Sequence, residues 1–460
     1  MNTVLISTYE LGHQPFGLAS PAAWLKDAGA NVTCLDLAVE GLDREAVVAA
    51  TLIAFYVPMH TATRLAISFL PKIQRLNPQA HICFYGLYAP LNEDLLRNLG
   101  VKTILGGEFE TGLLSLYHRL TANDQGDKNI EQPEPRIARH RQTFLIPERQ
   151  SLPPLNKYAY LSRTEGVQQA VGYTEASRGC KHLCRHCPVV PVYQGRFRIV
   201  QQDVVLADIA QQVEAGAAHI TFGDPDFFNG PRHALALVET LHQQWPHLTY
   251  DVTIKVSHLL RGQKYLPRLR ETGCLFVTSA VEAVNDEILQ FFKKGHTRSD
   301  FIRLVDIFRR EGLTLNPTFV AFNPWISLQG YQDFLHLIAD LDLVENVAPI
   351  QYAIRLLIPS QSRLLELPEV REMIGPFDEH KLVYPWRHID DRVDQLQEAI
   401  IDAVQQGEQD DQQRVNIFET VWQLTQSALQ HANPKPFKSL ALPRFRANKS
   451  IPHLSEPWYC

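Results

Sequence analysis

The stretch SRGCKHLCRHCPVVP, which runs from Ser177 to Pro191, places Cys180, Cys184 and Cys187 in one short segment. Three residues separate the first two of these cysteines and two residues separate the second pair, in a chain with seven cysteines in all. The other four cysteines are scattered, so no second Cys-x-x-Cys pair supplies a fourth thiolate. A structural zinc site needs four ligands, and three thiolates therefore leave one position of a metal centre open.

Two kinds of metal centre fit this stretch. His182 and His186 lie in the same segment and could complete a zinc site, although a closed tetrahedron is difficult to build within one tight loop. A [4Fe–4S] cluster normally takes four thiolates, and when three hold it, one iron stays free for another ligand. Gly179 precedes the first cysteine, where a reversal of the chain favours a residue without a Cβ.

The composition is that of a globular protein in a reducing compartment. Of the 460 residues, 45% are hydrophobic and 20% are charged, and the formal net charge is -6. We therefore expect no general affinity for nucleic acid or for anionic membranes. No apolar run reaches the roughly 18 residues of a membrane span, and the N-terminus lacks the features of a signal peptide. We expect a cytoplasmic protein, in which clustered cysteines more often bind metal than form disulfides.

Strand-like apolar runs alternate with helical periodicity over two parts of the chain. In the first part the predicted strands are residues 3–8, 31–37, 51–56 and 81–85. In the second part they are residues 172–176, 219–222, 250–256, 275–279, 313–320 and 350–357. Such alternation favours parallel sheets covered by helices, with ligands at the carboxyl ends of the strands.

The predicted fold class is therefore α/β. Residues 1–121 are predicted to form a flavodoxin-like (Rossmann-like) domain, and residues 165–360 a partial (β/α)6 barrel of the TIM type. Residues 122–164 between them, where polar residues and proline become frequent, are a predicted linker. Residues 361–460 lose the strand alternation and are predicted to be a helical C-terminal region with a tail.

The spacing Cys180-x3-Cys184-x2-Cys187, directly after the first strand of a predicted barrel, resembles the signature of the radical S-adenosylmethionine (SAM) superfamily. The resemblance implies that the three cysteines hold a [4Fe–4S] cluster and that its free iron binds SAM. It also implies reductive cleavage of SAM to a 5′-deoxyadenosyl radical, an electron donor such as flavodoxin or ferredoxin, and a small-molecule or peptide substrate. A zinc-stabilised binding module is the alternative from another functional class.

Two further segments resemble SAM-binding regions of this superfamily. In ITFGDPDFF, the residues Gly223, Asp224 and Asp226 match in position the loop that contacts the SAM amino group, and an Asx-type turn is the alternative. The segment VTSAVEAVNDEILQFFKKGHT resembles one that would turn Ser279 and Glu282 toward SAM. For Glu282 the alternative is a carboxylate at a helix N-terminus, where the helix dipole favours it.

Basic residues near these segments have weaker assignments. Lys255 and Arg355 end predicted strands, where each could offer a cation to a cofactor carboxylate or take part in an ordinary ion pair. Of the two, we name Arg355 as a candidate cofactor-binding residue. We interpret Lys294-Gly295 as a helix stop and not as a ligand.

The N-terminal domain resembles the cobalamin-binding module that precedes this kind of barrel in some radical SAM proteins. The resemblance covers about residues 1–120 and includes Gly106-Gly107-Glu108-Phe109-Glu110, which looks like the closing motif of that module. The Asp-x-His-x-x-Gly motif that supplies a histidine to cobalt is absent, because Gln-Pro-Phe-Gly follows His13 and no Asp stands two residues before it. A cobalamin-dependent radical SAM methyltransferase is therefore an alternative function, and a scaffold without cobalamin is another.

The end of the sequence, HLSEPWYC, resembles the approach to the tail of the CUAEP/CCAEP-tail radical SAM proteins, as do LLIPSQSRLLEL and YPWRHIDDRVDQLQEAI upstream. In that group a cysteine is followed by selenocysteine or cysteine. The resemblance implies that Cys460 is the first residue of a redox pair and that the sequence is a selenoprotein truncated at a UGA codon. An ordinary terminus that happens to end in cysteine is the alternative.

Overall fold

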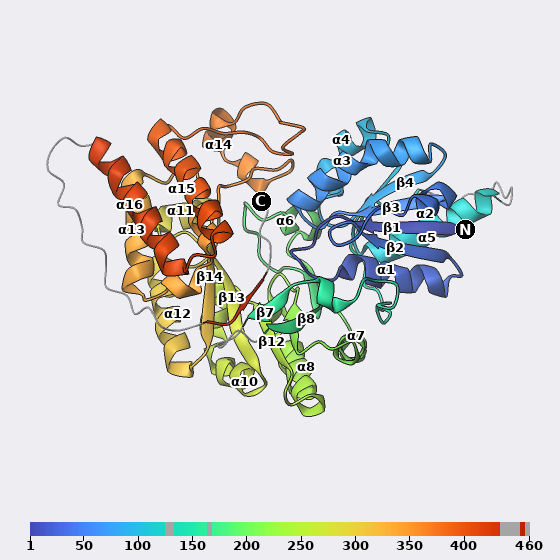
Figure 1. Cartoon of the computed structure of the whole chain (residues 1–460), viewed down its shortest axis with the longest axis horizontal. Coiled ribbons are helices and arrows are strands. Elements are labelled where there is room, and N and C mark those ends of the chain that lie inside the picture. The colour runs from blue at the N-terminus through green and yellow to red at the C-terminus, as the bar shows by residue number, and fades with distance from the viewer. Residues whose placement is uncertain (125–132, 163–167, 433–450, 456–460) are drawn as a thin grey trace.

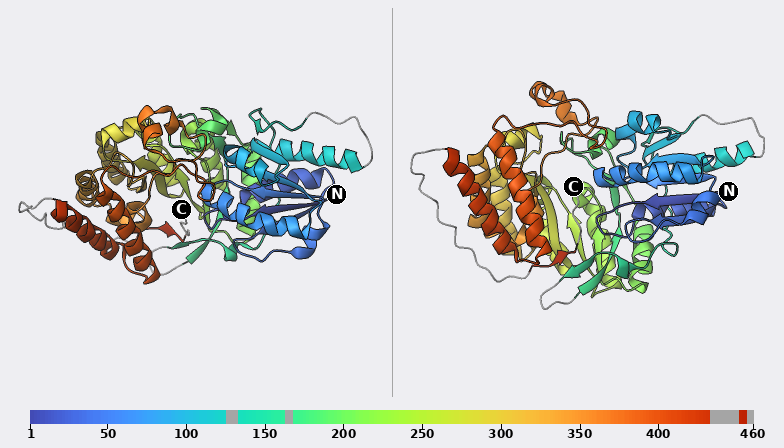
Figure 2. Two further views of the ribbon diagram at one scale, coloured as in Figure 1. Left: turned by 90° about the horizontal axis from the view of Figure 1, so that it is seen from above. Right: turned by 45° about the horizontal axis from the view of Figure 1, so that its top comes forward.

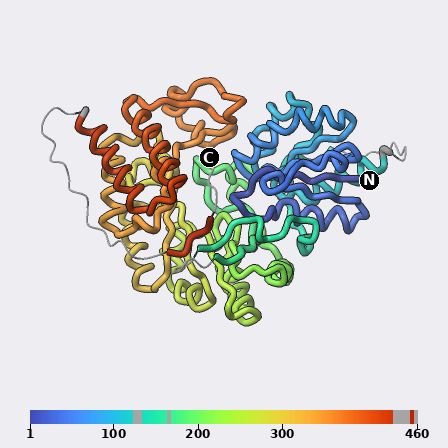
Figure 3. Tube along the Cα trace, viewed as in Figure 1, coloured from blue at the N-terminus to red at the C-terminus, as the bar shows by residue number. Residues whose placement is uncertain are grey.

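The structure, a computed structural model, describes residues 1–124, 133–162, 168–432 and 451–455. Two α/β units lie side by side, and the C-terminal helices pack on the side of the second unit that faces away from the first (Figures 1 and 2). Figure 3 follows the chain from the N-terminal unit through the second unit to these helices. Among the described residues, no helix combines the length and the apolar character needed to cross a membrane.

The N-terminal unit is a parallel sheet of six strands in the order β2-β1-β3-β4-β5-β6. Its strands are β1 (Asn2–Ser7), β2 (Asn31–Asp36), β3 (Leu52–Tyr56), β4 (His81–Tyr85), β5 (Thr103–Gly107) and β6 (Ile137–Ala138). Its helices are α1 (Phe16–Asp27), α2 (Arg44–Ala49), α3 (His60–Leu76), α4 (Glu93–Asn98) and α5 (Phe109–Asp124), with the short η1 (Pro90–Asn92). The four predicted strands are confirmed to within two residues.

Both faces of this sheet are buried. Along β1, Leu5 belongs to the hydrophobic core under α1 and α5, whereas Val4 and Ile6 belong to the core under α2 and α3. Successive side chains of a strand point to opposite faces, so a run of apolar residues is what a parallel sheet with helices on both sides needs.

The second unit is a curled sheet in the order β14-β13-β12-β11-β8-β7-β15. Five parallel strands, β8 (Gln168–Thr174), β11 (His219–Phe222), β12 (Thr249–Thr253), β13 (Cys274–Glu282) and β14 (Thr314–Phe319), form the half-barrel. Two antiparallel strands, β7 (Tyr160–Ser162) and β15 (His453–Leu454), extend its edge. A separate two-stranded ribbon pairs β9 (Ser177–Gly179) with β10 (Phe197–Ile199).

The helices of the second unit and of the C-terminal region mostly cover the outer face of the half-barrel. They are α6 (Val189–Tyr193), α7 (Gln202–Glu214), α8 (Pro231–Gln244), α9 (Val256–Arg261), α10 (Leu266–Glu271), α11 (Asp286–Phe291), α12 (Arg298–Glu311), α13 (Leu328–Asp340), α14 (Pro368–Met373), α15 (Asp391–Gln409) and α16 (Arg414–Ala432). Of these, α6 packs against Tyr88 and Leu91 of the N-terminal unit. Short 3-10 turns are η2 (Leu155–Lys157), η4 (Phe227–Asn229), η5 (Gln263–Tyr265), η6 (Val344–Asn346), η7 (Pro349–Tyr352) and η8 (Arg363–Glu366). The predicted helical C-terminal region is confirmed by α15 and α16, whereas His453 and Leu454 form the strand β15.

The sixth predicted barrel strand, residues 350–357, was wrong. The segment begins as the 3-10 turn η7, and only Arg355 forms a β-bridge, with Phe322. Pro349 starts this turn, since its ring fixes φ near the helical value and it has no N–H for a strand ladder. The Gln351 side chain accepts the Phe319 N–H that a sixth strand would have used (2.8 Å). The barrel is therefore a half-barrel.

The segment after residue 132, predicted as part of a linker, packs between the two units. Arg149 is buried, and its guanidinium donates two hydrogen bonds to the Asp208 carboxylate (2.8 Å each). It also donates to Gln14 Oε1 of the N-terminal unit (3.0 Å) and to the Tyr173 carbonyl of β8 (2.7 Å). One side chain thus ties α7, β8 and the N-terminal unit together.

We predict that Arg149→Met lowers the free energy of unfolding by about 3–5 kcal/mol, because it leaves the Asp208 carboxylate buried without its cation. Urea unfolding followed by circular dichroism measures this effect. Arg268→Ala is the control, since Arg268 pairs with Glu239 on the surface and its removal should leave the midpoint unchanged. Equal midpoints for Arg149→Met and the wild type would contradict the assignment.

Candidate cluster and cavity

The cysteine segment follows β8 and leaves the sheet through the short strand β9. Gly179 ends β9 with φ +72°, and a Cβ there would lie 2.5 Å from the Arg196 carbonyl oxygen. Only glycine fits this turn without displacing β10. The loop then carries the three cysteines and ends at α6, so the thiols lie near the carboxyl end of the half-barrel, where the fold predicts its active groups.

The three thiols lie close enough to influence one another electrostatically. Cys184 is buried and the other two are half-buried, and none of the six described cysteines forms a disulfide. Burial and then the neighbouring Cys184 raise the pKa of Cys187 to about 12, and burial also raises the pKa of Cys180. Cys180 and Cys187 therefore stay protonated in the metal-free protein, and a metal ion that binds them takes the place of the thiol protons.

Two buried lysines adjoin these thiols. Lys255 Nζ donates to Cys184 Sγ (3.4 Å). Lys294 Nζ lies 3.2 Å from Glu282 Oε1, and this carboxylate and the thiols of Cys184 and Cys187 raise the pKa of Lys294 although burial opposes the rise. Lys255 places an ammonium group beside the thiols, while the ammonium group of Lys294 is shared with the Glu282 carboxylate. The site therefore fits an anionic centre such as a three-cysteine [4Fe–4S] cluster. Lys294, interpreted from the sequence as a helix stop, instead lies beside the cysteines.

Asp226, a predicted SAM contact, is engaged with two histidines. Its Oδ2 lies 2.7 Å from His258 Nδ1 and 3.4 Å from His182 Nε2, while its Oδ1 accepts the Phe228 N–H (3.1 Å). His182 belongs to the cysteine loop and His258 to α9. The carboxylate thus joins the loop to the end of β12.

The remaining predicted contacts differ in where they lie. Glu282, at φ +72°, holds His186 (3.0 Å) as well as Lys294, beside the cysteines. Ser279 shares the face of β13 that carries Val277 into the hydrophobic core, so it points away from the cavity described below. Arg355 pairs with Asp394 (2.7 Å) and stacks on Trp386, also outside the cavity.

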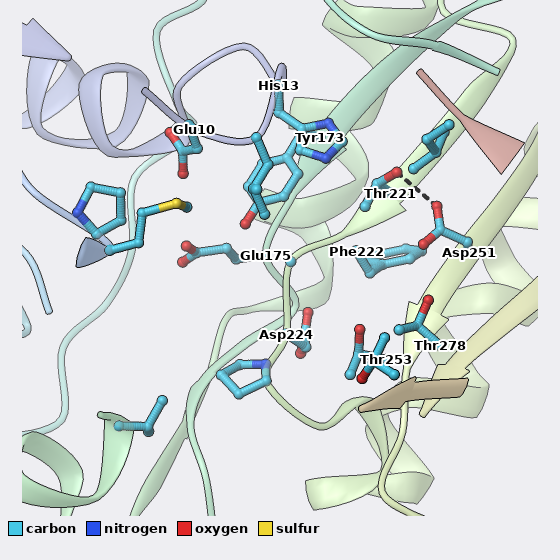
Figure 4. A pocket seen from close by; sticks show the side chains of 18 of the residues that line it. Glu10, His13, Tyr173, Glu175, Thr221, Phe222, Asp224, Asp251, Thr253 and Thr278 are labelled. Atoms are coloured by element: carbon cyan, nitrogen blue, oxygen red, sulfur yellow. Dashed lines mark hydrogen bonds between the residues drawn. The ribbon is translucent and has the colours of Figure 1, made fainter. Parts of the chain in front are cut away.

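A cavity of about 400 Å³ lies between the carboxyl ends of the two sheets (Figure 4). Gly223 and Asp224 line it, as the sequence predicts for residues at the end of β11. Asp224 also accepts hydrogen bonds from the Ala176 N–H (2.9 Å) and from Ser177 Oγ (2.5 Å), and burial raises its pKa to about 7. This residue therefore fixes the start of the cysteine loop and faces the cavity at once.

The wall toward the N-terminal sheet carries charges that sequence reasoning missed. Glu10, after β1, and Glu175, after β8, lie on this side (Figure 4). Burial and then Glu175 raise the pKa of Glu10. Arg178 is buried between Glu175 (2.5 Å) and Glu110 (2.7 Å) and lies over three phenylalanine rings. Only the position of Arg178, two residues before the first cysteine, could have indicated it.

The barrel side of the cavity is mainly polar, and Asp251 and Arg414 are charged residues of its lining. Thr221, Thr253 and Thr278 line it together with Asp251, which accepts a hydrogen bond from Thr221 Oγ1 (2.7 Å; Figure 4). Strand alternation on β13 brings Thr278 into the cavity and turns Ser279 away.

The C-terminal segment completes the wall. β15 pairs with β7, and both of its residues, His453 and Leu454, line the cavity. The Ser455 N–H donates to the Tyr160 carbonyl, and the Ser455 hydroxyl oxygen accepts the Tyr160 N–H (2.9 Å each). Cys460 lies outside the described residues, so its redox role stays a prediction.

Glu108 gives a pH test of the buried charges. It is fully buried, neither carboxylate oxygen has a hydrogen bond, and the nearest cation, Arg178, is 3.8 Å away. Burial raises its pKa from 4.5 to about 7, so the folded protein loses stability as pH rises from 4.5 through 7. Glu108→Gln should therefore stabilise the protein more at pH 8 than at pH 5, by up to about 3 kcal/mol.

Urea unfolding at the two pH values measures this difference. Glu110→Gln is the matched control with the opposite sign, because Arg178 lowers the pKa of Glu110 against the effect of burial. That variant should be less stable than the wild type at pH 8. A Glu108→Gln variant with the same gain at both pH values would refute the assignment.

Comparison with known proteins agrees with this geometry. The model of the radical SAM superfamily matches residues 174–337. A curated relative is the ribosomal protein uS12 methylthiotransferase of Bacteroides thetaiotaomicron, 21% identical over 187 residues, which are 38% of this chain and 42% of the relative. The match thus spans less than half of that relative's length.

Two solved structures share the fold over most of the chain. The radical SAM methyltransferase TsrM of Kitasatospora setae, with cobalamin and a [4Fe–4S] cluster bound, has a TM-score of 0.57 and 18% identity over 74% of this chain and 70% of that one. The cobalamin-dependent SAM radical enzyme OxsB, with aqua-cobalamin and SAM bound, has a TM-score of 0.68 and 14% identity over 88% and 67%. The chain therefore carries the domain of a radical SAM enzyme at residues 174–337, within a fold like that of cobalamin-dependent radical SAM enzymes.

Proposed function

We propose that the protein is a radical SAM enzyme in which Cys180, Cys184 and Cys187 hold a [4Fe–4S] cluster and the fourth iron binds SAM. The observation that carries the proposal is the convergence of three thiols at the carboxyl end of the half-barrel, beside two buried ammonium groups. When bound, the cluster and SAM supply a 5′-deoxyadenosyl radical. The electron comes from an external donor such as a flavodoxin or ferredoxin.

Residues of the chain position SAM and keep water out. Gly223 lets the β11 loop approach Tyr173 closely, since a Cβ there would lie 1.9 Å from the Tyr173 hydroxyl. Gly223 and Asp224 are the proposed SAM contacts because they face the cavity next to the cysteine loop. Asp226 and Glu282 act on the loop through His182 and His186, as positioning residues. Ser279 and Arg355 remain SAM contacts predicted from the sequence alone, because neither residue lines the cavity.

We propose that the substrate enters the barrel side of the cavity. The threonine hydroxyl groups and Asp251 on this side of the cavity suit a small polar molecule or a single peptide side chain. The cavity volume of about 400 Å³ is within the range of small-molecule sites. The N-terminal unit and β15 enclose this space, which protects a reactive radical from solvent.

A second candidate function is cobalamin-dependent methyl transfer. The carboxyl edge of the N-terminal sheet faces the barrel and presents Tyr56, Met59, Leu87 and Phe109 to the cavity, an apolar and aromatic wall that suits the face of a large flat cofactor. His13 lies in the loop after β1 and stacks on Tyr173 (4.8 Å). The fold likeness to TsrM and OxsB supports this candidate.

Product analysis separates the two candidates. Hydrogen abstraction without methyl transfer should yield 5′-deoxyadenosine alone, and methyl transfer should also yield S-adenosylhomocysteine and require added cobalamin. The assay uses the anaerobically reconstituted full chain with dithionite as reductant. S-adenosylhomocysteine formed only with cobalamin would favour the second candidate, and its absence with cobalamin bound would favour the first.

Replacement of one cluster cysteine tests the proposal itself. The reconstituted wild type should contain about four iron and four sulfide per chain and absorb near 400 nm, with a change on adding SAM. Cys184→Ala should lose the cluster and SAM cleavage while its circular dichroism stays that of the wild type. Cys274→Ala, a buried thiol of β13 outside the loop, should keep both. A colourless wild type with one zinc per chain would instead support a binding module.

A further inference from the structure

Lys255 is fixed at the carboxyl end of β12. It precedes α9, and its neighbours Ile254 and Val256 are both fully buried. The Ile254 N–H donates to the Thr278 carbonyl (2.9 Å), which pins the backbone to β13. The Lys255 side chain is itself only 8% exposed. The ammonium group therefore has little freedom to move to solvent.

The two buried lysines of the site differ in their partners. Lys294 is paired with the Glu282 carboxylate, so the pair carries no net charge. Lys255 forms no ion pair with any carboxylate of the described residues, and its side chain donates to Cys184 Sγ (3.4 Å). One unbalanced positive charge thus lies directly on a cluster ligand.

We infer that Lys255 is a positioning residue that raises the reduction potential of the cluster. Reduction adds a negative charge to a centre that three thiolates already make anionic. An unbalanced ammonium group in a buried site stabilises that charge, and a hydrogen bond to the ligand sulfur acts in the same direction. The inference rests on the proposed function, because it requires the cluster.

Three substitutions separate charge from packing. Lys255→Met removes the charge and the donor but keeps an unbranched apolar chain. Lys255→Gln keeps an N–H donor without the charge, and Lys255→Arg keeps both. Lys264→Met is the matched control, since Lys264 is exposed in η5, nine positions further along, and its charge is screened by solvent.

The experiment is an anaerobic redox titration of each reconstituted full-length variant, without SAM, followed by electron paramagnetic resonance. Iron and sulfide are counted first. Lys255→Met should shift the one-electron reduction equilibrium at least tenfold toward the oxidised cluster, which is a fall of 59 mV or more. The reduction potential of Lys255→Gln should lie between those of Lys255→Met and the wild type. The potentials of Lys255→Arg and Lys264→Met should equal that of the wild type.

The outcomes are distinct. A Lys255→Met or Lys255→Gln variant with a full cluster and an unchanged potential overturns the inference. A loss of SAM affinity with an unchanged potential also overturns it, because Lys255 would then be a SAM ligand. If Lys255→Met does not hold the cluster, the reduction potential of Lys255→Gln tests the inference in its place. A wild type that assembles no cluster refutes the proposed function, which the iron count reveals before any titration.

Discussion

The cysteine loop can present three thiols to one metal centre only because residues 224–229 hold it in place. Asp224 accepts hydrogen bonds from the two residues that open the loop, and Asn229 accepts the Lys181 N–H (3.1 Å) and donates to the Gly179 carbonyl (3.3 Å). Asp226 adds the contact with His182. A loop of this length has too few internal hydrogen bonds to fix its own shape, so the end of β11 serves as its template.

Electrostatics divide the space above the half-barrel. Carboxylates of Glu10, Glu175 and Asp224 lie around the cavity, whereas the ammonium groups of Lys255 and Lys294 lie beside the cysteines. Arg178 balances carboxylates at the boundary between the two units and not in the cluster shell. Lys255 therefore contacts a thiol and none of these three carboxyl groups, whose pKa values burial raises.

Most of the fold could be predicted from the sequence because apolar runs of parallel strands are local signals. The strands from β1 to β14 that follow such runs lie where they were predicted, within a few residues. The strand at 350–357 failed because its apolar pattern also suits a buried 3-10 turn, and Pro349 decides between them. The cysteine spacing indicated the cluster site, since its ligands are close in sequence. Lys255, Lys294 and Glu10 join the site from distant segments, and no local pattern marks which strand-end charge turns inward.

The pairing of β15 with β7 has a consequence for the order of assembly. It joins residues 295 positions apart in the chain, as in the hydrogen bond from Tyr160 to Ser455. Contacts of such separation form late, because the intervening chain must be ordered before they repay the entropy of closure. During synthesis, the half-barrel strands and the cysteine loop emerge from the ribosome long before residues 453–455. Throughout that interval the cavity lacks the wall that His453 and Leu454 supply.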